Sequence, residues 1–132
     1  MSTTRVASCS CGQLRATAVG EPVRVSVCHC LACQRRTGSV FGAQARFSAE
    51  AVTTSGESRT YVRVGDSGGE AHYNFCPQCG ATVYYTLVSN PGLVAIPVGA
   101  FADPAFPPPA RSIYESRMHS WVSVPQDIEH WQ

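Results

Sequence analysis

Residues 28–33 read Cys28-His29-Cys30-Leu31-Ala32-Cys33, which places three thiols in one short segment of the chain. Two cysteine pairs flank this segment, Cys9-Ser10-Cys11 before it and Cys76-Pro77-Gln78-Cys79 after it. A structural zinc site takes four protein ligands, whereas a catalytic zinc site keeps three and leaves one position open. The spacing of the seven cysteines therefore predicts one closed site and one open site.

The cysteines can be metal ligands or the halves of disulfides, and the surrounding sequence favours metal. The N-terminal stretch MSTTRVAS has no apolar run of signal-peptide length, and no segment is long enough to span a membrane. We therefore expect a cytoplasmic protein, in which structural disulfides are rare. An odd number of cysteines would also leave one thiol unpaired. The sequence predicts two zinc ions per chain as cofactors.

Short segments with the alternation of β-strands occupy most of the remaining sequence. In residues 13–19 and 23–27, apolar and polar side chains alternate as they do in a half-buried strand. Further candidate strands lie at residues 41–47, 51–54, 58–64, 71–75, 81–87, 93–98 and 112–114, separated by glycine and proline turns. Residues 31–36 and 126–131 are candidates for short helical turns. The pattern predicts an all-β domain of antiparallel sheets.

Composition limits both the number of domains and the kind of partner. A chain of 132 residues with 44% hydrophobic residues is expected to fold as one domain over residues 1–132. The formal net charge is +1, and Arg35-Arg36 is the only adjacent basic pair. These features exclude the basic footprint of a nucleic-acid-binding protein. We expect no membrane partner either, and the oligomeric state is not encoded in the sequence.

The first and third cysteine pairs have the features of a closed structural site. Each lies between two predicted strands and is followed by a glycine, Gly12 or Gly80, that permits a tight turn. A single zinc held by all four thiolates would join the N-terminal strands to the middle of the chain, and such a site stabilises folding. The predicted ligands of this structural zinc are Cys9, Cys11, Cys76 and Cys79.

The middle segment is predicted to hold an open, reactive zinc through Cys28, Cys30 and Cys33. A thiol bound there would be deprotonated and held as a nucleophile beside a metal that can polarise a carbonyl group. Arg35 or Arg36 could offset the negative charge of the site or hold a substrate carboxylate, and a solvated helix face is the simpler alternative. His72 is a candidate for the fourth ligand, with a surface or core role as its alternative.

Three motifs in order give the chain a specific resemblance. The motifs C-x-C-G, V-C-H-C-x-x-C-Q-R-x-x-G and F-C-P-x-C-G-A resemble those of the glutathione-dependent formaldehyde-activating enzymes, a family that includes centromere protein V. The resemblance implies a β-tent fold, a structural zinc on the four flanking cysteines and a catalytic zinc on the middle three. It also implies a carbon–sulfur lyase activity that condenses glutathione with formaldehyde to S-hydroxymethylglutathione.

Three functions compete on the sequence. The first is an enzyme of this lyase type, with a small glutathione-like thiol and a small aldehyde as partners. The second is a thiol-binding module without turnover, and the third is a zinc-stabilised interaction domain, against which the open three-ligand segment argues. No motif assigns substrate contacts beyond the zinc ligands. Proximity in sequence suggests Arg35, His72, Tyr73 and Trp121 as candidates.

Overall fold

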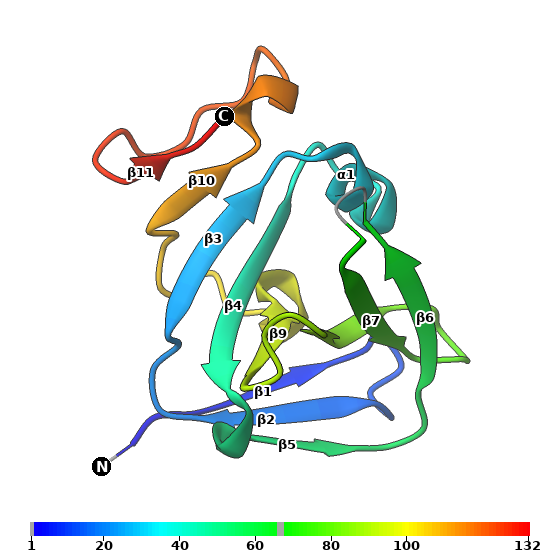
Figure 1. Cartoon of the computed structure of the whole chain (residues 1–132). Helices are drawn as coiled ribbons and strands as arrows, with labels where there is room; N and C mark the ends of the chain where they lie inside the picture. The colour runs from blue at the N-terminus through cyan, green and yellow to red at the C-terminus, as the bar shows by residue number, and fades with distance from the viewer. Residues whose placement is uncertain (1, 66–67) are drawn as a thin grey trace.

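The computed structural model describes residues 2–65 and 68–132, and that part of the chain consists of β-strands with one short α-helix (Figure 1). The all-β prediction is confirmed. The strands are β1 (Thr4–Ser8), β2 (Arg15–Val19), β3 (Arg24–Cys28), β4 (Gly42–Ser48), β5 (Val52–Ser55), β6 (Arg59–Val64), β7 (Glu70–Phe75), β8 (Thr82–Leu87), β9 (Leu93–Pro97), β10 (Arg111–Ile113) and β11 (Glu129–His130). The helix α1 spans Leu31–Thr37, and 3-10 turns lie at Ala49–Ala51, Val98–Phe101 and Glu115–Arg117.

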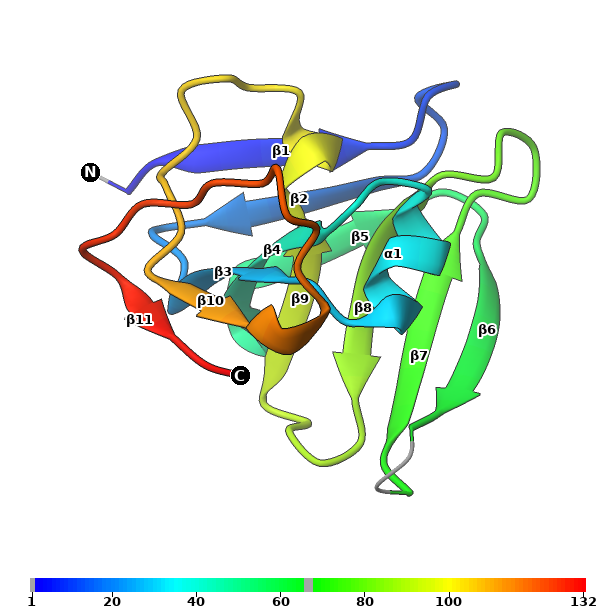
Figure 2. The same cartoon turned by 90° about the horizontal axis from the view of Figure 1, so that it is seen from above.

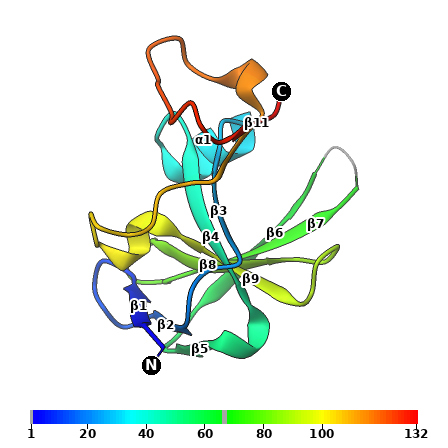
Figure 3. The ribbon, with the colours of Figure 1, turned by 90° about the vertical axis from the view of Figure 1, so that its left-hand side faces the viewer.

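The strands form a small sheet and a large sheet. The small sheet has the order β1-β2-β5, and the large one has the order β11-β10-β3-β4-β9-β8-β7-β6. Figure 3 shows β3 and β4 rising from the small sheet toward α1, while the β6–β7 hairpin leans away to one side. The predicted antiparallel pairing needs one correction, because β10 pairs in parallel with both β3 and β11. Long connections join these strands, and parallel pairing requires such connections in place of a tight turn.

The core lies between the small sheet and the central strands of the large one. Along β2, Ala16 and Ala18 are buried while Arg15 and Val19 are exposed, the alternation of a half-buried strand. The Pro-rich stretch at residues 106–110 returns to this core, because the Phe106 ring stacks on Phe101 at 4.7 Å between centroids. The side chains of the main buried cluster include Leu14, Val25, Phe47, Val83, Ile96, Phe101 and Phe106.

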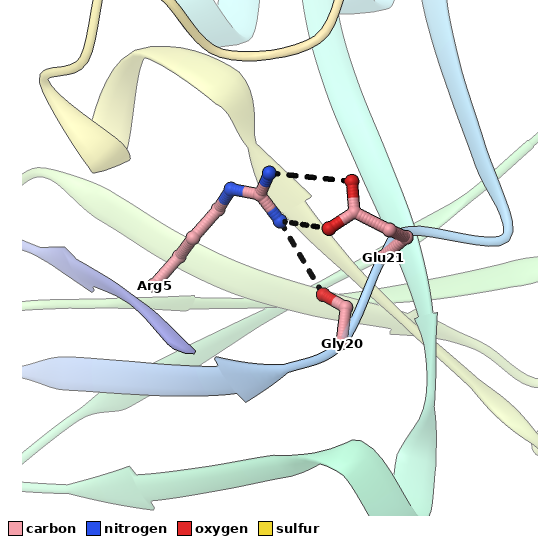
Figure 4. A network of polar contacts seen from close by, with 3 residues as sticks. All are labelled: Arg5, Gly20 and Glu21. Atoms are coloured by element: carbon pink, nitrogen blue, oxygen red, sulfur yellow. Dashed lines mark hydrogen bonds and ion pairs between the residues drawn. The ribbon is translucent and has the colours of Figure 1, made fainter. Parts of the chain in front are cut away.

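Arg5 on β1 forms hydrogen bonds with the β2–β3 connection. Its guanidinium donates two hydrogen bonds to the Glu21 carboxylate, at 3.0 and 3.3 Å, and one to the Gly20 carbonyl at 3.3 Å (Figure 4). The same guanidinium lies over the Phe106 ring, 5.2 Å from its centroid. These contacts join the small sheet to the segment that precedes β3.

The second predicted helical turn, at residues 126–131, is wrong. The segment contains the two-residue strand β11, which pairs with β10, and Trp131 N donates to Ser112 O at 2.9 Å. Six residues are too few to nucleate a helix without support, whereas the edge of β10 supplies partners for the backbone. Trp121 also lies in this C-terminal region and is 73% exposed, which places it outside the core.

Candidate metal centres

The four flanking cysteines come together at the point where the two sheets meet. Cys9 and Cys11 lie in the β1–β2 connection of the small sheet, and Cys76 and Cys79 lie in the β7–β8 connection of the large sheet. All four sulfurs are within 4.8 Å of one another. Cys9 and Cys76 are buried, while Cys11 and Cys79 are exposed. We call this group the four-cysteine cluster.

The two connections have matching backbone geometry. Cys9 N donates to Leu14 O at 3.0 Å, and Cys76 N donates to Ala81 O at the same distance. In each turn, the first cysteine is therefore hydrogen-bonded to the residue five positions later. The glycines that follow the second cysteine adopt the positive φ that the sequence predicted, +84° at Gly12 and +81° at Gly80. A β-bulge between Asn74 and Phe75 interrupts the β7–β8 register immediately before Cys76. Bulges redirect side chains at such positions.

The sulfur separations fit a tetrahedral metal site and do not fit disulfides. Cys9 Sγ and Cys11 Sγ are 3.6 Å apart, and Cys11 Sγ and Cys76 Sγ are 3.7 Å apart. Tetrahedral zinc with Zn–S bonds of about 2.3 Å would hold its sulfurs about 3.8 Å apart. A disulfide requires about 2.05 Å, and all seven cysteines are free thiols in this structure. The four-cysteine cluster therefore has the donor set and the spacing that zinc requires.

Gln13 supports this cluster, and sequence reasoning missed it because no motif marks it. Its side-chain Nε2 donates to Cys76 Sγ at 2.9 Å and to Glu57 O at 2.7 Å, and its Oε1 accepts from Glu57 N at 2.8 Å. Burial raises the pKa of Cys76, but the Gln13 hydrogen bond and those from backbone N–H groups outweigh burial and lower it to about 6. Gln13 therefore stabilises the thiolate form of a buried sulfur.

We expect Gln13→Ala to weaken metal retention at the four-cysteine cluster by about 10- to 100-fold, the usual cost of losing a hydrogen bond to a metal ligand. The measurement is the rate of zinc release to a coloured chelator. Gln78→Ala is the matched control, since Gln78 is exposed in the same turn and its backbone N–H, which donates to Cys76 Sγ at 3.4 Å, is retained. Equal release rates in the two variants would contradict the role of Gln13.

The middle cysteines form a second group, the three-cysteine cluster, at the junction of β3 and α1. Cys28 ends β3, Cys30 is the N-cap residue of α1, and Cys33 lies in the first turn of the helix. The three sulfurs lie within 4.8 Å of one another. The Cys30 side chain accepts a hydrogen bond from Cys33 N at 3.3 Å, so the cap of the helix and the cluster share one sulfur.

At this separation, ionisation of one sulfur disfavours ionisation of the others. Hydrogen bonds from Cys28 and Cys33 lower the pKa of Cys30, whereas the hydrogen bond to Cys30 and burial raise the pKa of Cys28 far above its usual value. One thiolate thus forms easily and the next does not, because like charges oppose one another. A divalent cation removes this opposition, so the donor set fits zinc. Cys28 is buried, and Cys30 and Cys33 are partly exposed.

His29 holds the cluster against β10 and does not belong to the sulfur group. Its ring Nε2 and Ser112 Oγ are 2.9 Å apart in the interior, and its backbone N donates to Ile113 O at 3.0 Å. Gln34 Nε2 donates to His29 O at 2.9 Å, which ties α1 to the same point. Burial lowers the pKa of His29, so the ring is neutral. Ser112 lies outside the three motifs, and Gln34 lies in the middle motif, but the sequence assigned neither residue a role.

Of the other candidate residues, Tyr73 and Arg36 contact each other, whereas His72 and Arg35 do not join them. Among the residues that the structure describes, no histidine joins either sulfur group. His72 contacts Glu70 at 3.1 Å, and strand alternation on β7 places it on the opposite face from Tyr73. Tyr73 lies against Arg36 of α1, with the Arg36 guanidinium 5.5 Å from the Tyr73 ring centroid. Arg35 is exposed.

Comparison with known proteins found one family and similar solved structures. The sequence profile of the glutathione-dependent formaldehyde-activating enzyme family matches residues 4–122. The crystal structure of a Rhodobacter sphaeroides protein from a structural genomics programme is similar in fold, with a TM-score of 0.57 and 18% sequence identity over 96% of this chain and 99% of that chain. No curated protein sequence matches the chain significantly. Within residues 2–65 and 68–132, no helix has the length and apolar character to cross a membrane.

Proposed function

The chain belongs to the glutathione-dependent formaldehyde-activating enzyme family, and from that premise we propose that it adds a small glutathione-like thiol to formaldehyde or a similar aldehyde. The observation that carries this proposal is the three-cysteine cluster, which offers three ligands and leaves the fourth corner of a tetrahedron to the thiol. In reaction terms the protein is then a carbon–sulfur lyase of the S-hydroxymethylglutathione synthase type that works in the cytoplasm.

The proposed metal assignment follows the two sulfur groups. Cys9, Cys11, Cys76 and Cys79 would hold a structural zinc, and Cys28, Cys30 and Cys33 would hold a catalytic one. A zinc ion bound by the three-cysteine cluster would supply a Lewis acid that favours the thiolate form of a bound thiol. We further propose that residues 1–132 act as one domain, since Phe106 in the late loop packs into the same core as Leu14 and Phe47.

The protein residues have a clear task in this reaction. The thiol loses its proton to solvent, the sulfur forms a bond to the aldehyde carbon, and the carbonyl oxygen takes a proton from solvent to give a hydroxymethyl thioether. Cys28, Cys30 and Cys33 would hold the zinc ion, and through it the sulfur of the bound thiol. The buried His29–Ser112 contact and the Gln34 hydrogen bonds keep the cysteine segment rigid, so little reorganisation is needed when the thiol binds.

The experiment that tests the proposal is exchange spectroscopy of glutathione with formaldehyde, in the presence and absence of the zinc-loaded protein. We expect the rate of S-hydroxymethylglutathione formation to rise at least tenfold above the uncatalysed rate in proportion to protein concentration, because a positioned thiolate contributes both proximity and activation. An unchanged rate with bound glutathione would identify a thiol-binding module. An unchanged rate without glutathione binding would leave the chain as a zinc-stabilised interaction domain.

A further inference from the structure

Arg36 is a partly buried cation beside the three-cysteine cluster, and neither the motifs nor the comparisons explain it. It lies in the last turn of α1, and its guanidinium sits over the rings of two tyrosines on neighbouring strands. The guanidinium carbon is 5.5 Å from the centroid of Tyr73 on β7 and 5.3 Å from that of Tyr85 on β8. Figure 2 shows α1 in front of β7 and β8, which is the arrangement that allows this contact.

Gly42 lies next to the Arg36 guanidinium. It lies on β4 directly opposite Cys28 in the β3–β4 ladder. A methyl group added at Gly42 would lie 2.9 Å from Arg36 Nη2 and 3.4 Å from Cys33 Cβ. Arg36 and Cys33 are therefore neighbours across Gly42, and the absence of a side chain at position 42 provides the space for the guanidinium.

The charge of Arg36 has no protein partner in the described part of the chain. Its Nε and Nη2 atoms are buried without a hydrogen-bond partner, and none of the recorded ion pairs includes it. A buried, unpaired charge is costly unless something compensates it. The tyrosine rings offset part of that cost through cation–π contact. The three-cysteine cluster lies close by, and the positive charge of Arg36 acts to lower the pKa of Cys33.

Charge counting indicates what a cation beside a zinc-loaded cluster would do. Three thiolates and one divalent zinc carry a net charge of −1, and a fourth thiolate would take the group to −2. A neutral fourth ligand such as water would leave the charge at −1. A fixed positive charge beside the cluster therefore favours an anionic fourth ligand over a neutral one. At a partly buried site the effective dielectric constant is well below that of water, so a neighbouring unit charge changes such a preference by about tenfold or more.

We propose that Arg36, held between the Tyr73–Tyr85 pair and Gly42, is the fixed counter-charge that selects an anionic sulfur as the fourth ligand of the three-cysteine cluster. The inference rests on the proposed function, since it requires that a thiol bind there. Arg36 is a positioning residue in this role, because it acts through the charge of the cluster and does not contact the aldehyde. The thiol proton that is lost on binding passes to solvent.

Titration calorimetry of the zinc-loaded full chain with 2-mercaptoethanol tests the inference. This thiol has no carboxylate, so any effect of Arg36 concerns the sulfur alone. We expect the wild-type chain to release about one proton per thiol bound, measured by comparing buffers of different ionisation enthalpy. Arg36→Met keeps the packing of the side-chain stem but removes the charge, and we expect it to bind the thiol at least tenfold more weakly.

Two further variants separate charge from packing. Arg36→Lys keeps the charge and should stay within about threefold of the wild-type affinity, although a lysine matches the tyrosine pair less well. Arg35→Met removes the same charge from the adjacent, exposed position and should bind as the wild type does. Zinc content is measured for every variant, and loss of one zinc in Arg36→Met alone would support the same charge role.

Three other results would contradict the role of Arg36, the proposed function, or both. Equal thiol affinity in Arg36→Met and wild type, with formaldehyde addition intact, would overturn the role of Arg36 and leave the proposed function standing. An equal loss in Arg36→Lys and Arg36→Met would show that packing and not charge matters, which also overturns it. Failure of the wild-type chain to bind any thiol would overturn the proposed function and the inference together.

Discussion

Cys79→Ser is expected to unfold most of the protein at 37 °C, although the residue is exposed and contributes little packing. The reason is that the substitution removes one ligand of the four-cysteine cluster, where the two sheets meet. Structural zinc contributes about 10–16 kcal/mol of apparent binding free energy in small zinc domains. The total stability of a domain is only about 5–15 kcal/mol. The loss of this one metal therefore exceeds what the remaining contacts can supply.

Thermal unfolding followed by circular dichroism, with zinc content measured in parallel, checks this expectation. The matched control is the same substitution in the other cluster, Cys33→Ser. Cys11 and Cys76 are 65 positions apart, so the four-cysteine cluster closes a long loop. By loop-closure entropy a cross-link over about 65 residues stabilises by about 4 kcal/mol, against about 2 kcal/mol over about 5 residues. A Cys79→Ser protein as stable as Cys33→Ser would refute the structural assignment of the four-cysteine cluster.

Cys30→Ser is expected to reduce zinc content from two ions to one and to bring formaldehyde addition down to the uncatalysed rate. The fold should remain intact, because the serine hydroxyl can replace the Cys30 sulfur as the N-cap acceptor of Cys33 N. The substitution therefore removes a metal ligand while keeping the start of α1. The whole rate enhancement, expected to be at least about tenfold, should be lost, since both the position and the ionisation of the attacking thiol depend on the cluster.

Cys30→Ala provides the comparison that separates the two roles of this sulfur. It removes the cap as well as the ligand, and loss of an N-cap costs about 1 kcal/mol. We expect both variants to lose the same zinc and the same activity, while Cys30→Ala is less stable than Cys30→Ser by about 1 kcal/mol, the cost of the lost cap. Metal analysis, urea unfolding and the exchange assay together check this. Retention of two zinc ions in Cys30→Ser would rule out Cys30 as a ligand.

Much of this protein could be predicted from local patterns. The alternation in residues 13–19 gave a half-buried strand, which the structure has as β2, and the glycines after Cys11 and Cys79 have the positive φ expected of a tight turn. The helix at residues 31–36 is present as α1. Each of these features depends on residues a few positions apart, because backbone sterics and side-chain period act over that range.

The errors arose where the outcome depended on distant partners. Residues 126–131 form β11 and not a helical turn, because the edge of β10 accepts their backbone hydrogen bonds. Such positions are decided by which surfaces the rest of the chain leaves available, and a local pattern carries no information on that.

The sequence by itself determined the division of the cysteines into four and three, because spacing and flanking glycines are local properties of the chain. The tertiary structure alone decided what surrounds each group. It brought Gln13 to Cys76 across 63 positions, His29 to Ser112 across 83, and Arg36 onto the rings of Tyr73 and Tyr85. Hydrogen bonds and charges act through space, so their partners depend on how distant strands pair and pack.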